Sequence, residues 1–326
     1  MKFGPVPLAQ AAGAILAHSV ATPDGRLRKG RVLKPEDLAK IAAAGLEDVI
    51  VAALEPGDVP ENDAAQALAT ALVGRGVHLT DAFTGRVNVL ADGPGVAILD
   101  AAAIHAANAV HPMITIATVP GFQQMAGQGM LATVKIISYA VPRDALETAC
   151  NAAKGALQLA RPVRTTATLI VTEIPGGPGA KGQAAIADRI AALGGALEDV
   201  ASVPHRIEPL SRAIAEAQSD VVLILTGSAT SDPDDVAPSA LRAAGGTVSR
   251  FGMPVDPGNL LFIGARNGTP VIGLPGCARS PALNGADWVL ARVMCGLEVG
   301  DAEIAGMGVG GLLKEIPTRP QPRRGA

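Results

Sequence analysis

The segment that decides the fold runs from Val221 to Asp235 and reads VVLILTGSATSDPDD. Its first five residues are all apolar and mostly β-branched, which is typical of a strand buried on both faces of a parallel sheet. Glycine, small hydroxylic side chains and aspartates follow Leu225, and a helical pattern begins at Asp234. A buried strand, a small-residue loop and a helix in this order predict a ligand site at the carboxyl end of the strand.

This alternation of strand and helix continues over the C-terminal half of the chain. The strands there are nearly all apolar, which a parallel sheet covered by helices on both faces requires. The sequence therefore predicts an α/β fold, a three-layer αβα domain with a mostly parallel sheet. We expect strands at residues 168–171, 199–203, 221–225, 260–264 and 270–273 and helices at 183–193, 209–218, 234–244 and 281–294.

The N-terminal half has a less regular pattern, which predicts a separate mixed α+β domain. Pro142 and Pro162 interrupt the chain near its end, because proline breaks helices. We expect this domain over residues 1–150, the α/β domain over 163–312, and a Pro/Arg-rich tail or linker over 313–326. Within the first domain we expect helices at 8–17, 35–44, 61–72 and 144–160 and strands at 48–52, 86–90, 95–99, 113–118 and 132–140.

The composition argues against several classes of function. Of the 326 residues, 48% are hydrophobic and 17% are charged, so the chain can bury a sizeable core. Aromatic residues make up 2% and the net charge is −3, which argues against nucleic-acid binding. The cysteines and histidines are scattered, so we expect neither disulfides nor a metal site built from them. Because neither a signal peptide nor an apolar stretch of about 18 residues is recognisable, we expect a cytoplasmic protein without a membrane span.

Three junctions between a strand and a helix are candidate ligand sites. The first, residues 175–182, reads PGGPGAKG and contains a GxGxxG pattern. Its two prolines disfavour the tight turn that approaches a pyrophosphate, so we favour an ordinary Gly/Pro loop. The second, residues 226–235, offers backbone amides, hydroxyl groups and the helix dipole to an anion. Its acids are then left to hold Mg²⁺ or a ligand N–H group.

A helix start explains part of the second junction. Asp232 suits the N-cap, Pro233 the first helical position and Asp235 the capping-box position. A helix start does not explain the small hydroxylic and glycyl residues between the strand and the cap. Capping alone and ligand binding therefore stay open as equal alternatives for this loop.

The third junction, residues 273–281, reads GLPGCARSP and follows another apolar strand. Ser280 suits the N-cap of the next helix, and Pro281 suits its first helical position. Arg279 is a candidate phosphate clamp, although a solvated side chain is the favoured interpretation of this residue alone. No histidine or acid is tied to Cys277 by spacing, so we expect an incidental thiol. Two such junctions in one domain predict a site between neighbouring loops.

These motifs resemble the molybdopterin-binding domain of molybdenum-cofactor biosynthesis proteins of the Mog/MoaB and MoeA type. That family has Thr-Gly-Gly after a strand and an Asp nine positions after the Thr. Thr226, Gly227 and Asp235 fit this pattern, and Ser228 replaces the second Gly. The family's Leu-Pro-Gly-Asn/Gln-Pro-x-Ser motif is similar to residues 274–280.

The resemblance covers residues 165–296, and it includes residues 253–260, which are similar to the Pro-Gly-Lys-Pro segment of the MoeA type. It implies a fold of the molybdopterin-binding type, whose loops at 226–235 and 273–280 hold the phosphate and the pterin of molybdopterin or of its molybdenum-loaded form. The implied binding residues are Thr226, Gly227, Ser228, Thr230, Ser231, Asp235, Pro275, Gly276, Arg279 and Ser280.

The resemblance also implies roles for some of these residues. The amides of Gly227, Ser228 and Gly276 and the hydroxyl group of Ser280 would donate hydrogen bonds to the ligand. Asp235 would accept one from a pterin N–H group or position Mg²⁺.

The chain departs from this family at several positions. Asp256 and Asn259 stand where the MoeA type has lysines, and the N-terminal MoeA signature Asp-Asn-Ser-Ala-Met-Asp-Gly-Tyr-Ala is absent. His205 stands where the Mog type has a second acid. Cys277 and Ala278 replace Asn/Gln-Pro, which removes a side-chain amide from the loop. Metal insertion and adenylyl transfer are therefore left open.

Four functions remain open from the sequence. The leading hypothesis is a protein that binds molybdopterin and presents it to a nucleotidyl- or sulfur-transferring partner, such as a nucleotidyltransferase domain or a molybdoenzyme maturation partner. The second is an Mg-ATP-dependent adenylyltransferase acting on molybdopterin, in which Asp235 would be catalytic and a candidate Mg²⁺ ligand. The third is a nicotinamide-nucleotide-cleaving protein with a similar domain. The fourth is a non-catalytic interaction domain, and we expect a homo-oligomer.

Overall fold

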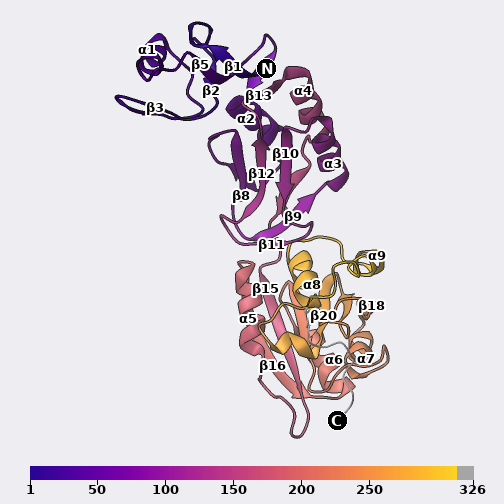
Figure 1. The fold of residues 1–326 in the computed structure, drawn as a ribbon. Helices are drawn as coiled ribbons and strands as arrows, with labels where there is room; N and C mark the ends of the chain where they lie inside the picture. The colour runs from indigo at the N-terminus through magenta and orange to yellow at the C-terminus, as the bar shows by residue number, and fades with distance from the viewer. Residues whose placement is uncertain (314–326) are drawn as a thin grey trace, which may run out of the picture. The chain divides into compact units, whose positions relative to one another are not determined.

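The computed structural model describes residues 1–313, which divide into two compact units (Figure 1). The first unit consists of Met1–Asp92, Ala97–Gly121 and Gly127–Leu159. The second unit takes up Gly93–Val96, Phe122–Ala126 and the chain from Ala160 onward. The assignment of two short segments of the N-terminal half to the second unit was not predicted from the sequence. Most of the predicted tail, residues 314–326, lies outside the described residues.

Small antiparallel sheets and short helices make up the first unit. Near the N-terminus, β5 (Asp48–Ala53) pairs with β1 (Lys2–Pro7) and β2 (Ile15–Leu16), and buried Ile41 of α1 (Pro35–Ala43) belongs to the same core. A four-stranded antiparallel sheet has the order β10-β12-β8-β7, and α2 (Glu61–Leu72) packs on β8 and β12. The strands of that sheet are β7 (Val77–Leu79), β8 (Arg86–Ala91), β10 (Ile114–Thr118) and β12 (Met130–Ile136).

The shorter elements complete the N-terminal half. Two further helices, α3 (Ala101–Val110) and α4 (Arg143–Ala152), contact each other. The remaining strands form the sheets β3-β4, β13-β6 and β11-β9-β14. Their bounds are β3 (Val20–Thr22), β4 (Gly25–Leu27), β6 (Asp58–Pro60), β9 (Gly95–Leu99), β11 (Gln124–Met125), β13 (Ala140–Pro142) and β14 (Leu157–Ala160).

Several sequence-based expectations for this half were wrong. The helix predicted at 8–17 is a single 3₁₀ turn, Leu8–Gln10, because Gly13 adopts a left-handed conformation (φ 79°) that ends helical structure. The helix predicted at 144–160 ends at Ala152, and Gly155 (φ 67°) leads the chain into β14. The strand predicted at 132–140 is divided between β12 and β13, and α3 was missed.

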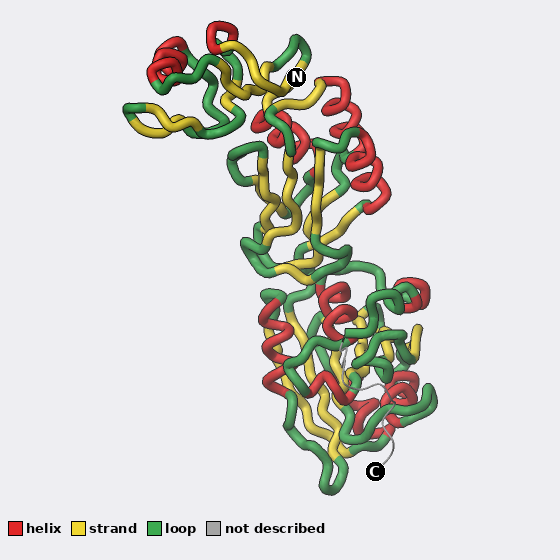
Figure 2. The backbone as a smooth tube through the Cα atoms, in the orientation of Figure 1, coloured by secondary structure: helices red, strands yellow, loops and turns green. Residues whose placement is uncertain are grey.

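A sheet with helices beside it forms the centre of the second unit, drawn with strands in yellow and helices in red in Figure 2. The sheet has six strands in the order β16-β15-β17-β20-β19-β18. The first four strands are parallel to their neighbours, and the hairpin partners β19 and β18 are antiparallel. The strands are β15 (Thr166–Glu173), β16 (Ala196–Pro204), β17 (Val221–Leu225), β18 (Thr247–Phe251), β19 (Phe262–Arg266) and β20 (Thr269–Leu274). All five residues of β17 are buried, as expected for the centre of such a sheet.

Helices cover both faces of this sheet. On one face, α6 (Ile207–Glu216) and α7 (Val236–Ala243) form a core with Ile170, Val222 and Ile224. Because side chains alternate along a strand, the buried residues between these point to the opposite face. The helices α5 (Gln183–Ala192) and α8 (Gly285–Met294) belong to that face, and Arg189 Nε lies 2.6 Å from Asp287 Oδ1 between them. The predicted three-layer α/β fold with a mostly parallel sheet is confirmed. A short α9 (Asp301–Ala305) follows.

The β19–β20 pair supplies a test of this packing. Gly273 of β20 lies beneath the ring of Phe262, its partner on β19, and a Cβ at Gly273 would lie 1.9 Å from ring atom Cε1. Gly273→Ala must displace a fully buried ring, so we expect the free energy of unfolding to fall by about 1–3 kcal/mol. Urea denaturation followed by the fluorescence of Trp288, the single tryptophan, measures this change.

Gly276→Ala is the matched control, because a Cβ there meets no atom within 4 Å. Equal destabilisation by the two substitutions would contradict the close packing of ring and glycine.

Candidate functional site

Three loops meet at the carboxyl edge of the central sheet. Because β15, β17 and β20 are adjacent and parallel, the segments that follow them leave the sheet at the same edge. We call these segments the β15 loop (residues 174–182), the β17 loop (residues 226–235) and the β20 loop (residues 275–284). They correspond to the three junctions identified in the sequence, including the Gly/Pro loop that was set aside as ordinary.

Arg279 connects all three loops. From the β20 loop, its Nη2 donates to the carbonyl oxygen of Thr226 at 2.8 Å. Its Nη1 donates to the carbonyl oxygens of Lys181 at 2.5 Å and Gly179 at 3.3 Å, both in the β15 loop. A planar guanidinium has enough fixed N–H groups to reach several carbonyls at once. The predicted pairing of the β17 and β20 loops is therefore present, and the β15 loop joins them.

Gly182 makes room for this arrangement. Its φ of 97° lies in the left-handed region, and a Cβ there would lie 2.6 Å from the Cα atom of Arg279. The backbone of the β15 loop can therefore approach Arg279 only because position 182 has no side chain.

Asp235 caps the helix that follows the β17 loop. Its Oδ1 accepts from the amide of Val236 at 2.7 Å, and its Oδ2 accepts from the amide of Ser231 at 3.1 Å. The prediction that Asp232 is the N-cap was wrong, since α7 begins three residues later than that residue requires. Asp232 instead accepts from the amide of Asp234 at 2.8 Å. The side chain of Asp235 is only partly buried, so its remaining lone pairs can accept from a ligand.

The amide of Gly227 is already bonded within the protein. It donates to Oγ1 of Thr172 at 2.9 Å, and the same Oγ1 lies 2.8 Å from Nδ1 of His205. Sequence reasoning did not assign Thr172 a role, although a polar residue directly after the apolar run Leu169–Val171 is a signal for one. The family resemblance implied that the Gly227 amide donates to the ligand, but in the structure this amide donates to Thr172.

Other amides at this edge have no hydrogen-bond partner among residues 1–313. They include the amides of Ser228, Ala229 and Thr230 in the β17 loop and of Gly276 and Cys277 in the β20 loop, and several amides of the β15 loop share this property. Successive unpaired amides favour negatively charged groups. The hydroxyl groups of Thr226 and Thr230 are both buried and lie 3.4 Å apart. These amides are the groups of the site that are available to an anionic ligand.

The β20 loop begins as a 3₁₀ turn, Gly276–Arg279, after buried Pro275. The expected helix start at Ser280 and Pro281 was wrong: α8 starts at Gly285, where Asn284 accepts from the amide of Ala286 and forms a capping box with Asp287. Ser280 Oγ accepts from the amide of Ala282 at 3.2 Å and keeps its proton for another partner.

Cys277 is half-buried in the β20 loop, and burial raises the pKa of its thiol. The thiol is therefore neutral at ordinary pH, which does not suit a nucleophile.

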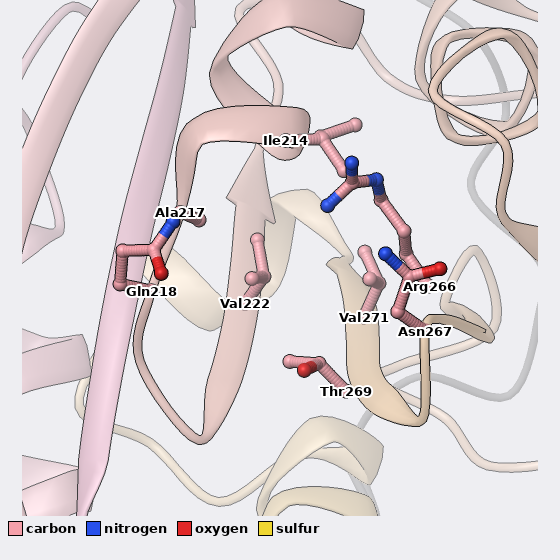
Figure 3. Close-up of a pocket in the computed structure, with 8 residues that line it drawn as sticks. All are labelled: Ile214, Ala217, Gln218, Val222, Arg266, Asn267, Thr269 and Val271. Carbon is pink, nitrogen blue, oxygen red and sulfur yellow. The ribbon is translucent and has the colours of Figure 1, made fainter.

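A separate pocket of about 260 Å³ lies at the opposite, amino end of β17 and β20 (Figure 3). Ile214, Val222 and Val271 contribute its apolar lining. Arg266 also lines it, but its Nε donates to the carbonyl oxygen of Ala244 at 2.8 Å and so caps the C-terminus of α7. This pocket therefore lies apart from the three loops.

In residues 1–313, no group of three or more His, Cys, Asp and Glu side chains is placed to hold a metal ion. No helix of that part of the chain is both long and apolar enough to cross a membrane.

The contacts of Arg279 predict the behaviour of Arg279→Lys. A lysine ammonium donates from a single nitrogen and cannot reproduce the two nitrogens with which Arg279 reaches both loops, so the β15 loop loses part of its anchor. We expect hydrogen exchange at the amides of Gly177 and Lys181 to become about tenfold faster, which corresponds to the loss of one hydrogen bond. Hydrogen-exchange mass spectrometry or NMR measures this rate.

Arg206→Lys is the matched control, because the side chain of exposed Arg206 has no hydrogen bond or ion pair within the described residues. Unchanged exchange in Arg279→Lys would mean that the three loops are ordered without this guanidinium.

Comparison with known proteins supplies independent information on this unit. Residues 175–292 match the model of a family described as a probable molybdopterin binding domain, and residues 5–53 match a domain of unknown function (DUF8806). No curated protein matches the chain. Solved structures do, among them the molybdopterin biosynthesis MoeA protein from Pyrococcus horikosii. The likeness has 18% identity and a TM-score of 0.31 over 90% of this chain and 75% of that one.

Proposed function

We propose that this protein, whose residues 175–292 belong to the molybdopterin-binding domain family, acts in molybdenum cofactor biosynthesis by binding molybdopterin or its molybdenum-loaded form. The proposal rests on the unpaired amides of the β17 and β20 loops. Hydrogen bonds from Arg279 hold these two loops side by side at one edge of the sheet. An anionic cofactor with an N–H-rich ring system matches a site with amide donors and one partly exposed carboxylate.

The charges of the site favour one orientation of the ligand. Asp235 repels a phosphate but accepts hydrogen bonds from the N–H and amino groups of a pterin. The β20 loop offers the amide of Gly276 and the hydroxyl group of Ser280. It also offers those N–H groups of Arg279 that do not donate to the carbonyl oxygens of Gly179, Lys181 and Thr226. We therefore place the pterin beside Asp235 at the end of the β17 loop, with Thr226, Thr230 and Ser231 shaping the pterin side. The phosphate then lies between the β20 loop and the amides of Ser228 and Ala229 at the start of the β17 loop.

Binding and presentation of the cofactor fit these contacts better than adenylyl transfer. A nucleotidyltransferase would need a second acid beside Asp235 to hold Mg²⁺. The acids nearest to this role are Asp232, Asp234 and Glu173, and their side chains have other partners among the described residues. Asp232 accepts from the amide of Asp234, Asp234 Oδ1 lies 3.3 Å from Arg242 Nη1, and Glu173 Oε1 accepts from Ser202 Oγ at 2.6 Å, whereas the side chain of Asp235 contacts Ser231 and Val236. A bound cofactor must then pass to an acceptor, for which we propose a nucleotidyltransferase domain or a molybdoenzyme maturation partner.

The substitution Asp235→Asn tests the binding site without removing the helix cap. Asparagine keeps an acceptor oxygen for the amide of Val236, whereas alanine would cost about 1 kcal/mol of helix stability. Loss of the charged acceptor should raise the Kd for molybdopterin roughly 10- to 100-fold, as expected for a hydrogen bond to a charged group. Anaerobic fluorescence titration measures this Kd.

Asp100→Asn is the matched control for this experiment. Asp100 is also an N-cap, since its Oδ1 accepts from the amide of Ala103 at 3.0 Å, but it caps α3 in the first unit. This variant should bind molybdopterin like the unchanged protein. Equal affinity in both variants would show that Asp235 does not contact the ligand.

Added ATP and Mg²⁺ distinguish the remaining functions. Release of pyrophosphate on incubation with molybdopterin would identify adenylyl transfer instead of simple binding. A protein with no affinity for molybdopterin would leave two functions, the nicotinamide-nucleotide-cleaving protein and the interaction domain, and a product assay with the nicotinamide nucleotide would separate them.

A further inference from the structure

A chain of hydrogen bonds at the carboxyl edge runs from Gly227 through Thr172 to His205. Thr172 is fully buried at the end of β15, with 0% of its surface exposed. Its Oγ1 accepts from the Gly227 amide at 2.9 Å and lies 2.8 Å from His205 Nδ1. The close approach requires glycine, because a Cβ at position 227 would lie 2.7 Å from the carbonyl oxygen of Thr172.

The buried hydroxyl group decides which nitrogen of His205 carries the proton. The Gly227 amide is a donor only, so Oγ1 must accept from it and direct its own proton elsewhere. Nδ1 of His205 is the acceptor within reach among the described residues. If Nδ1 carried the proton, the hydroxyl proton would be buried without a partner, which costs free energy. The neutral imidazole therefore carries its proton on Nε2.

The chain also links three neighbouring strands. His205 follows β16, Thr172 ends β15, and Gly227 follows β17, and these strands are adjacent in the order β16-β15-β17. The backbone of His205 is fixed by its amide, which donates to the carbonyl oxygen of Glu173 at 2.9 Å. The backbone of His205 is therefore anchored to the sheet, and its imidazole is connected to the β17 loop through the hydroxyl group of Thr172.

We infer that His205 is a positioning residue for the β17 loop: Nδ1 orients the hydroxyl group of Thr172, which in turn holds the amide of Gly227 at the start of that loop. The unpaired amides of Ser228, Ala229 and Thr230 follow directly after this anchor. The identity of the ligand rests on the proposed function, whereas the hydrogen-bond chain does not.

NMR spectroscopy of the full chain without ligand tests the hydrogen-bond chain itself. At a pH where the ring is neutral, the ¹⁵N shifts of His205 should show an unprotonated Nδ1 and a protonated Nε2. Thr172→Val removes the hydroxyl group at nearly constant volume, and exchange of the Gly227 amide should become about tenfold faster. Thr172→Ser should restore slow exchange.

His78→Gln serves as a control and should leave the exchange of the Gly227 amide unchanged, because the partly exposed His78 contacts Asp92 in the first unit. A proton on Nδ1 of His205, or unchanged Gly227 exchange in a folded Thr172→Val variant, would overturn the inference.

A second pair of variants tests the consequence for binding. His205→Asn keeps an acceptor oxygen near the position of Nδ1, whereas His205→Phe keeps a ring without an acceptor. Asparagine should preserve slow Gly227 exchange and the Kd for molybdopterin, and phenylalanine should raise this Kd about tenfold. Equal Kd values for the two folded variants would contradict the positioning role. If the unchanged protein does not bind molybdopterin at all, the proposed function fails, while the ligand-free NMR result still decides the inference.

Discussion

The guanidinium group of Arg279 is the contact on which the candidate site depends most. It donates to carbonyl oxygens of the β15 and β17 loops from a position in the β20 loop. Three loops that lack regular hydrogen bonds lose much conformational entropy when they are ordered, and a parallel sheet fixes only their starting points. A planar donor group that satisfies several carbonyls at once supplies the missing restraint. The guanidinium is partly buried, which strengthens its bonds to Gly179 and Thr226 because water competes less for those carbonyls.

The same residues start helices and line the site. Asp235 is both the N-cap of α7 and the carboxylate that faces the loop amides, so its position is set by the helix. A ligand that contacts Asp235 therefore meets a side chain whose rotamer is already fixed. Helix capping and ligand binding, which the sequence left as alternatives, are compatible because a carboxylate has more lone pairs than the two amides use.

Local pattern predicted the fold of the second unit well, and long-range contacts limited the rest. Both ends of the strand at 221–225 were predicted correctly. Five consecutive apolar residues are typical of a strand that is buried on both faces of a parallel sheet. The starts of α7 and α8 were misplaced, since several residues before each helix can cap it and packing selects among them. The pairing of Thr172 with His205 spans 33 residues and depends on strand order, which periodicity does not reveal.

The prediction that the β17 and β20 loops share an edge required only two parallel strands with glycine-bearing ends. The contribution of the β15 loop to the site was missed. Its prolines and glycines predict local turns, but they do not indicate a contact with Arg279. Thr226 and Arg279 were expected to contact a ligand, and their positions in the loops suit that role. In the structure the two residues contact each other: the guanidinium of Arg279 donates to the carbonyl oxygen of Thr226.

Backbone groups dominate the donors that this site offers. The β20 loop has a thiol and a methyl group, Cys277 and Ala278, where a side-chain amide is expected from the family resemblance. Burial raises the pKa of the Cys277 thiol, so this side chain offers only a weak neutral donor. In the proposed binding mode, amides such as those of Ser228 and Gly276 donate to the ligand, and their positions are set by the main chain. Contacts that fix the main chain, from Arg279 on one side and Thr172 on the other, therefore determine where these donors lie.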